Sequence, residues 1–435
     1  MSDKKEKTVY VGITGDIIHP GIINIIQQGA KYGRLIVGLL TNSAIATHKR
    51  IPYLTYEQRK QVLENIKGVS EVVPQEDWSY VPNLLKLKPN YIIHGDDWKT
   101  NYLKGIRKEV YEVMKEIGGE VIEIPYTKGI NSSQLFENKT NNGITIEQRL
   151  KSLKLLIKYK PVVRIMEANS GLTGLMIENL KIEKDDGIHK FDGIFCSSFT
   201  DFTSNYKTEL IEFDSLDFST TINTLTDIVE CTTKPIICGY NADLSDNLSL
   251  LIENFEIMGI SAVIFGDKYK IKTGLSNKEE LYNEKDFSFK IKEGKMAQRN
   301  PDFMIIAGIE DLNFGKSVDE ALKKAFSSIK SGADGILISS NKNTGEDIKE
   351  FCQKFRKEDK ETPIVLIPTH YNQYTEKELS EWGANIIIYY NYLRRAAYPA
   401  MKKCAETILK SQRSLEVNGM CMPIKEILNL IPGTN

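Results

Sequence analysis

Short apolar runs of strand length recur along most of the chain, and amphipathic stretches of helical length separate most of them. A strand of a parallel sheet is covered on both faces and therefore reads as a nearly continuous apolar run. Strands that alternate with helices are typical of α/β domains with parallel sheets. The pattern thus predicts a parallel α/β protein, and a length of 435 residues predicts two or three domains.

The first 135 residues contain one series of these runs. A helical stretch from Pro20 and another from Thr55 lie between runs, and the pattern predicts a doubly wound parallel sheet over residues 1–135. A polar stretch rich in Asn and Gly follows, and we interpret residues 136–159 as a linker. The expected strands are residues 9–13, 35–40, 71–74, 91–95 and 120–125.

Residues 160–435 contain a second, longer series. Eight β/α units in about 270 residues have the size of a TIM-type (β/α)8 barrel, and we expect C-terminal helices after it. The expected barrel strands are residues 162–168, 192–198, 235–240, 262–267, 302–310, 335–340, 363–369 and 385–390.

Charge and composition exclude several classes of partner. Lys and Arg number 57 against 58 Asp and Glu, so no basic excess suggests nucleic acid. No apolar stretch approaches the roughly 18 residues of a spanning helix, so we expect no membrane insertion. The polar start does not resemble a signal peptide. The six cysteines lack the spacing of metal ligands and indicate reduced thiols, so we expect a cytoplasmic protein.

The strand ends of such a barrel carry its functional groups. Magnesium binds to hard oxygen ligands, usually one or two carboxylates together with substrate phosphate. Asp267 and Glu310 are the obvious acids at the expected ends, and Lys268 beside Asp267 favours a structural ion pair there. Gly239, Gly266 and Gly308 occupy three neighbouring ends. These glycines could simply shape turns, but their positions favour a site that has lost its working groups.

Six segments make the chain similar to a known family: residues 164–179, 191–198, 261–274, 300–310, 392–401 and 422–434. They resemble the phosphoenolpyruvate mutases of the isocitrate lyase superfamily, and the N-terminal part resembles the cytidylyltransferase domain fused to some of them. The resemblance implies a Mg²⁺-dependent interconversion of phosphoenolpyruvate and phosphonopyruvate, and activation of a phosphonate with CTP, in phosphonate biosynthesis.

The family's metal and phosphoryl groups are largely replaced. Its Asp-Gly-Asp motif corresponds to residues 239–241, which read Gly-Tyr-Asn. Its Glu-Asp-Lys motif is reduced to Gly266, Asp267 and Lys268, and its phosphoryl-binding arginine is Gly308. Removing one preorganised electrostatic group typically costs about 10²–10³ in rate. With three acids and an arginine missing, we expect neither mutase activity nor a Mg²⁺ site.

Other family positions are kept in part. The gating-loop lysine corresponds to Lys272 with Gly274 in place of its companion asparagine, the phosphoryl-handling aspartate to Glu209, and a histidine to Ser339. We regard Lys272 and Glu209 as vestigial catalytic residues. An alternative is an active isomerase or lyase with an altered substrate, which would use the remaining charged groups without a metal. The vestigial substrate-binding residues are Glu167, Ser197, Asp267, Lys268, Glu310 and Asn391.

The N-terminal domain departs less from its family. The motif His-x-Gly-His at a helix start, where a phosphate is favoured, reads His19-Pro20-Gly21-Ile22 and lacks its second histidine. We expect weak binding of CTP or another nucleotide with little transfer. Taken singly, Arg59 fits a solvated helix charge equally well, and Asp97 with Trp98 fits a turn and a core ring. The candidate nucleotide-binding residues are His19, Lys49, Arg59, Asp97, Ser132 and Ser133.

Residues 397–417 predict a helix with an apolar face. In the family this face is buried on a neighbouring subunit; the alternative is a helix packed on its own barrel. We expect a homo-oligomer, a dimer or tetramer, that is a catalytically inactive homologue retained as a structural or regulatory protein with possible partner proteins. The apolar positions are Ala400, Met401, Cys404, Ile408 and Leu409.

Overall fold

The computed structural model describes residues 6–99, 103–125, 144–184, 187–197, 218–240, 247–273 and 276–426. The chain divides into two compact units. The first contains Met1–Asn142 and Lys181–Lys190, and the second contains Gly143–Leu180 and Phe191–Asn435.

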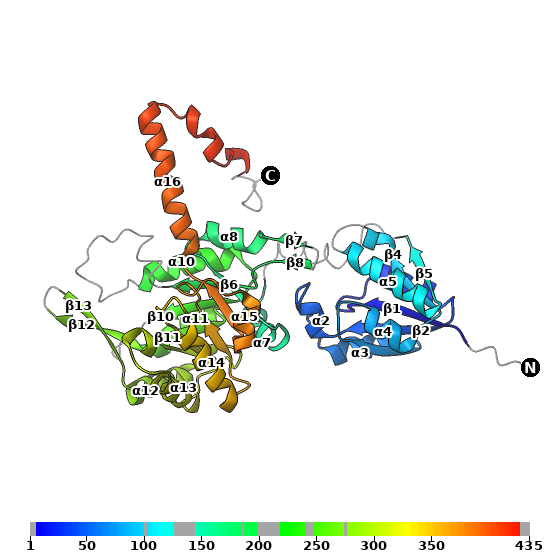
Figure 1. Ribbon diagram of the computed structural model, residues 1–435, viewed down its shortest axis with the longest axis horizontal. Helices are drawn as coiled ribbons and strands as arrows, with labels where there is room; N and C mark the ends of the chain where they lie inside the picture. The colour runs from blue at the N-terminus through cyan, green and yellow to red at the C-terminus, as the bar shows by residue number, and fades with distance from the viewer. Residues whose placement is uncertain are drawn as a thin grey trace, which may run out of the picture. The chain divides into compact units, whose positions relative to one another are not determined.

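The first unit is a five-stranded parallel sheet in the order β3-β2-β1-β4-β5 (Figure 1). Val9 and Val11 belong to one buried cluster, and Tyr10 between them belongs to another, so both faces of β1 are covered. This confirms the doubly wound sheet. The strands are β1 (Thr8–Ile13), β2 (Arg34–Leu40), β3 (Glu71–Gln75), β4 (Tyr91–Gly95) and β5 (Glu120–Ile124). The helices are α1 (Pro20–Gly29), α2 (Asn42–Ala46), α3 (Tyr56–Glu64), α4 (Val81–Leu87), η1 (Asp96–Lys99) and α5 (Leu103–Ile117).

The second unit is a closed barrel of eight parallel strands, as the sequence predicts. Each strand alternates between a side chain inside the barrel and one that faces the helices. The strands are β6 (Val163–Glu167), β9 (Gly193–Ser197), β10 (Ile236–Tyr240), β11 (Ala262–Gly266), β14 (Met304–Ile309), β15 (Gly335–Ile338), β16 (Ile364–Leu366) and β17 (Ile386–Tyr389). The helices are α7 (Ile146–Tyr159), α8 (Gly171–Asn179), α10 (Phe218–Cys231), α11 (Leu248–Met258), α12 (Glu284–Ala297), η2 (Asp311–Phe314), α13 (Val318–Lys330), α14 (Glu346–Glu358), α15 (Glu376–Trp382), α16 (Tyr392–Ser411) and η3 (Leu415–Met420).

The interpretation of residues 136–159 as a linker does not hold for its described part. From residue 146 this range is the helix α7, which belongs to the barrel unit. Thr145 and Gln148 form a reciprocal capping box that starts the helix, and Leu150 and Leu153 are buried in the barrel cores. The Asn- and Gly-rich pattern of a linker ends before the Thr145 cap and does not extend to this apolar helix face.

Two short hairpins depart from the β/α repeat. The hairpin β7 (Ile182–Lys184) and β8 (Gly187–His189) follows α8 in sequence but groups with the first unit. The hairpin β12 (Lys268–Thr273) and β13 (Ser276–Leu281) follows β11.

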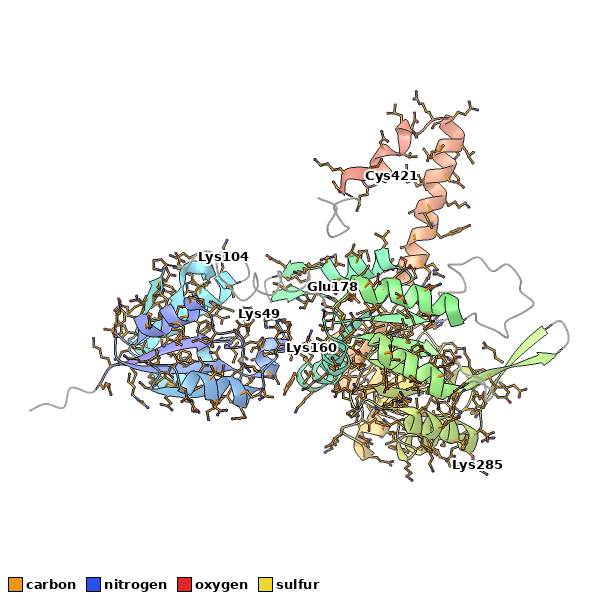
Figure 2. All side chains as sticks on the ribbon, turned by 180° about the vertical axis from the view of Figure 1, so that it is seen from behind. Lys49, Lys104, Lys160, Glu178, Lys285 and Cys421 are labelled. Atoms are coloured by element: carbon orange, nitrogen blue, oxygen red, sulfur yellow. The ribbon has the colours of Figure 1, made fainter. Side chains whose placement is uncertain are left out.

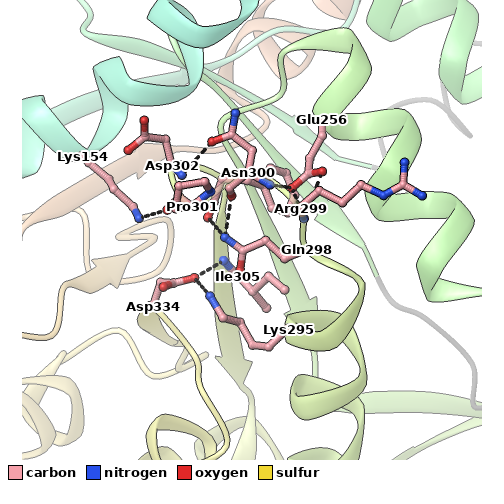
Figure 3. A network of polar contacts seen from close by, with 11 residues as sticks. Lys154, Glu256, Lys295, Gln298, Arg299, Asn300, Pro301, Asp302, Ile305 and Asp334 are labelled. Carbon is pink, nitrogen blue, oxygen red and sulfur yellow. Dashed lines mark hydrogen bonds and ion pairs between the residues drawn. The ribbon is translucent and has the colours of Figure 1, made fainter.

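The turn before β14 is fixed by side chains (Figure 3). The Glu256 carboxylate accepts hydrogen bonds from the backbone N–H of Arg299 at 3.0 Å and of Asn300 at 2.9 Å. Asp334 accepts one from the N–H of Ile305 at 2.8 Å and pairs with Lys295 at 2.9 Å. These contacts anchor the beginning of β14, the strand that carries Gly308 near its other end.

The helix α16 leaves the barrel and carries no buried residue (Figure 1). Its apolar side chains Met401 and Leu409 are 63% and 78% exposed, so within one chain the expected apolar face is not covered. The alternative of a helix packed on its own barrel is therefore wrong for this structure. Among the described residues, no helix is long and apolar enough to cross a membrane.

Candidate functional site

The carboxyl ends of the barrel strands form a ring of inward positions. Phe195, Ile264 and Ile306 lie in the cluster that fills the barrel interior. The positions two residues further along the same strands share that orientation. The top of the barrel is therefore lined by Ser197, Gly266 and Gly308, together with Glu167, Gly239 and Tyr390.

The space beside Gly239 is backed by an aromatic pair. A Cβ at this position would lie 3.0 Å from Cζ and 3.4 Å from Cε2 of Phe195. The Phe195 ring in turn packs edge-on against Tyr390, with ring centroids 6.0 Å apart. An aspartate at position 239 would fit only if the Phe195 ring moved.

Gly308 is more tightly enclosed, because one of its neighbours is backbone. A Cβ there would lie 3.1 Å from the carbonyl oxygen of Phe265 and 3.1 Å from Cγ2 of Ile264. An arginine at this position would require the neighbouring strand to shift.

Glu167, Ser197 and Asn391 are brought together, as the rim prediction implies. The Glu167 side chain is nearly fully buried and accepts hydrogen bonds from Ser197 Oγ at 3.2 Å and from the backbone N–H of Asn391 at 2.5 Å. Burial raises the pKa of Tyr390 next to this group, against the opposing effect of a hydrogen bond with Ser197. The carboxylate of Glu167 is thus held by donors of the protein itself.

Asp267 takes part in a buried ion pair. It is 0% exposed, and its carboxylate accepts hydrogen bonds from Lys324 Nζ at 2.7 Å and from the backbone N–H of Glu310 at 3.0 Å. Lys324 also pairs with Asp311 at 2.6 Å. Burial raises the pKa of Asp267 to about 7, although the Lys324 ammonium opposes the shift. The expected structural ion pair is present, but the partner is Lys324 and not the neighbouring Lys268.

Lys324 and Asp311 are not among the site residues predicted from the sequence. The signal for Lys324 was present, since Ala321, Ala325 and Ser328 mark the buried face of α13 and Lys324 falls among them. A lysine on an apolar face requires a buried acid nearby.

Lys268 and Glu310 remain at the rim as a pair. Lys268 Nζ lies 3.3 Å from Glu310 and 3.6 Å from Glu279. Burial lowers the pKa of Lys268, but the two carboxylates outweigh it, so the net shift is upward. Ser339 accepts a hydrogen bond from Asn313 Nδ2 at 3.1 Å.

The described rim fits Mg²⁺ poorly. Glycines 239, 266 and 308 offer no side-chain oxygen, and Asp267 is neutralised by Lys324. In the described ranges, no group of three His, Cys, Asp or Glu side chains could hold a metal. Ser198, Glu209, Asn241 and Gly274 lie outside the described residues, as does the side chain of Lys272.

The first unit places His19 at the start of α1, as the motif predicts. His19 is the N-cap residue of a helix with Pro20 in its first turn. Its ring atom Nδ1 is buried and has no hydrogen-bond partner among the described residues. Burial lowers the pKa of His19, so the neutral imidazole is favoured. Ile22 packs against the apolar core instead of offering a second imidazole.

Arg59 is a buried structural residue, so its interpretation as a solvated helix charge is wrong. Its guanidinium is 0% exposed and donates to the carbonyl oxygen of Leu40 at 2.9 Å, to the carbonyl of Thr14 and to the side chain of Asn42. Thr14 follows β1 and Leu40 ends β2, so Arg59 ties together the loops after these two strands.

The remaining candidate nucleotide-binding residues lie in different environments. Lys49 is exposed, with its Nζ 5.4 Å from the ring centroid of Trp78 (Figure 2). Trp98 is a ring of the core, as the structural interpretation predicts. It is fully buried and stacks on His94, with ring centroids 4.0 Å apart. Ser132, Ser133 and the side chain of Asp97 lie outside the described residues.

Comparison with known proteins places both units in families. The family model for phosphoenolpyruvate phosphomutase matches residues 153–409, and that for cytidylyltransferase-like domains matches residues 10–138. Phosphoenolpyruvate phosphomutase of Tetrahymena pyriformis is 24% identical over 301 residues, which are 68% of this chain and 95% of that protein. Glycerol-3-phosphate cytidylyltransferase of Bacillus spizizenii is 32% identical over 132 residues, 30% of this chain and 94% of that protein.

A solved structure supports the same assignment. The structure of a phosphonopyruvate hydrolase in complex with oxalate and Mg²⁺ aligns with a TM-score of 0.55 at 26% identity, covering 66% of this chain and 95% of that one. The closed barrel and the match of the family model over more than half of the chain define a phosphoenolpyruvate mutase-like α/β protein. The chain belongs to the phosphoenolpyruvate phosphomutase family and carries a cytidylyltransferase-like domain before the barrel.

Proposed function

We propose that this chain is a family member whose barrel no longer interconverts phosphoenolpyruvate and phosphonopyruvate, and which is retained as an oligomeric structural or regulatory protein. The main support is the Phe195 ring, whose Cζ lies 3.0 Å from where the Cβ of an acid at position 239 would stand. Phosphoryl transfer depends on positioning and on neutralising charge. Gly308 and the neutralised Asp267 leave the described rim without the groups for either task.

For the first unit, the proposal is weak binding of CTP or another nucleotide without appreciable cytidylyl transfer. Two features support binding. His19 lies at the start of α1, where the backbone N–H groups favour a phosphate, and its buried Nδ1 makes no hydrogen bond to the described residues. Ile22 in place of the second histidine argues against transfer.

The barrel proposal predicts a very low turnover. In a coupled assay with phosphonopyruvate and Mg²⁺, we expect turnover more than about a hundredfold below the typical enzyme value of ~10 s⁻¹. The Tetrahymena relative, assayed in parallel, is the positive control. Calorimetric titration of Mg²⁺ in the presence of phosphonopyruvate should give heat for the relative and none for this chain. Turnover within a hundredfold of the typical value would refute the proposal.

A second candidate is a family enzyme with an altered substrate that works without a metal. The Lys268–Glu310 pair and the buried Glu167 favour it, because they keep charged groups at the rim. Binding of a 2-oxo acid in the absence of Mg²⁺, lost on Lys268→Ala, would favour this candidate over an inactive barrel.

The structural role predicts assembly through α16. The apolar side chains Met401 and Leu409 of α16 are 63% and 78% exposed in one chain, and we expect them to be buried on another copy. Light scattering at micromolar concentration should therefore give a dimer or tetramer. Leu409→Asp should dissociate it, whereas Lys410→Asp on the same helical turn should not. A monomeric wild-type protein would remove the support for both assembly and a structural role.

A further inference from the structure

The segment after α16 folds back on the helix and brings two cysteines together. Gln412 ends the helix in a left-handed conformation with φ 53°, which reverses the chain. Val417 in η3 is buried, although α16 itself has no buried residue. Cys404 Sγ on α16 then lies 3.9 Å from Cys421 Sγ directly after η3 (Figure 2 labels Cys421).

This pair differs from the other thiols of the chain. Cys196, Cys238 and Cys352 are buried and Cys231 is partly exposed, whereas Cys404, which is also partly exposed, lies against the exposed Cys421. The sulfurs are in van der Waals contact, and a bonded pair requires about 2.05 Å, so a modest movement of an exposed segment would close the gap. In a single chain, small oxidants therefore have access to two thiols that already lie next to each other.

We propose that Cys404 and Cys421 form a redox-sensitive clasp, a reversible disulfide that locks residues 412–421 against α16. The oxidant is a low-molecular-weight disulfide such as oxidised glutathione. This inference does not depend on the inactivity of the barrel or on nucleotide binding.

The reaction is a thiol–disulfide exchange in two steps. The Cys421 thiolate attacks one glutathione sulfur, the glutathione S–S bond breaks and one glutathione thiolate leaves. The Cys404 thiolate then attacks the Cys421 sulfur and releases the second glutathione. The two cysteines lose two protons and two electrons in total, and the glutathione disulfide takes them up. Cys421 is more exposed than Cys404, which favours Cys421 as the first nucleophile.

The test uses full-length protein treated with oxidised glutathione and then alkylated. We expect alkylation to be lost at Cys404 and Cys421 and kept at Cys231, and the denatured chain to run as a monomer without reductant. Lys410 and Arg413 lie between the cysteines. Tryptic cleavage there should leave the two fragments joined until dithiothreitol is added. Backbone hydrogen exchange in residues 412–421 should be slower in the oxidised protein.

Variants make the test specific. Cys404→Ser and Cys421→Ser should each abolish the linked fragments, while Cys231→Ser, which changes a thiol on α10, should not. A covalent dimer, a lasting glutathione adduct on Cys421 with Cys404 still alkylated, or unchanged reactivity of both thiols would overturn the clasp.

Discussion

Replacing Lys324 with methionine is expected to lower the free energy of unfolding of the barrel by about 3–5 kcal/mol, because it leaves buried carboxylates without their cation. The side chains of Lys324, Asp267 and Asp311 are 5%, 0% and 1% exposed. Methionine keeps the length of the lysine stem, so the effect of lost charge exceeds that of lost packing. Chemical denaturation, monitored by the hydrogen exchange of barrel peptides, measures the unfolding of this unit separately from that of the first unit.

The matched control is Lys323→Met on the same helix. Lys323 is 75% exposed and pairs with Glu284 at 2.9 Å, and exposed pairs contribute at most about 1 kcal/mol. Adding Asp267→Asn and Asp311→Asn to Lys324→Met should recover part of the loss, since the remaining groups are then uncharged. Equal effects of the two lysine substitutions would show that the buried cluster does not stabilise the barrel.

The same cluster predicts the sign of a pH effect. The pKa of Asp267 is raised from 3.8 to about 7 in the folded state, so between these values the native state binds more protons than the unfolded state. The stabilising contribution of Asp267 to the free energy of unfolding is therefore fully present below about pH 4. This contribution is lost as the pH rises through about 7. Burial acts to raise the pKa of Asp311, but Lys316 and Lys324 outweigh it, so the pKa of Asp311 is lowered. The pH dependence of its stabilising contribution is therefore the opposite, and this contribution is lost as the pH falls.

The fold was predictable because its signal is local. Each barrel strand is an apolar run, such as Ala262–Gly266, and this alone predicts a buried parallel strand. The missing acids at positions 239 and 266 were equally visible, because the motif is contiguous. The pairing of residues was not visible. Asp267 and Lys324 are 57 positions apart, and although the apolar neighbours of Lys324 mark it as buried, nothing local identifies Asp267 as its partner. The contact of Phe195 with Gly239 likewise depends on the register between β9 and β10.

Arg59→Ala is expected to lower the free energy of unfolding of the first unit by about 3 kcal/mol. The substitution removes a buried charged donor from several acceptors, and hydrogen bonds to charged groups contribute about 1.5–3 kcal/mol each. It leaves the carbonyl oxygens of Leu40 and Thr14 and the Asn42 side chain without this donor. Lys60→Ala, one position further on the exposed face of α3, should change stability by less than about 0.5 kcal/mol.

Nucleotide binding distinguishes the two roles that Arg59 could have. If Arg59 acts by tying the loops after β1 and β2, then Arg59→Ala loses both stability and CTP binding, because the loops at the nucleotide site are no longer fixed. His19→Ala should lose CTP binding while stability is kept, since His19 Nδ1 makes no hydrogen bond to the described residues that the substitution could remove. Calorimetric titration of CTP into each variant, next to hydrogen exchange of peptides from the first unit, measures both properties. An Arg59→Ala protein that keeps its stability but no longer binds CTP would instead show that Arg59 contacts the nucleotide directly.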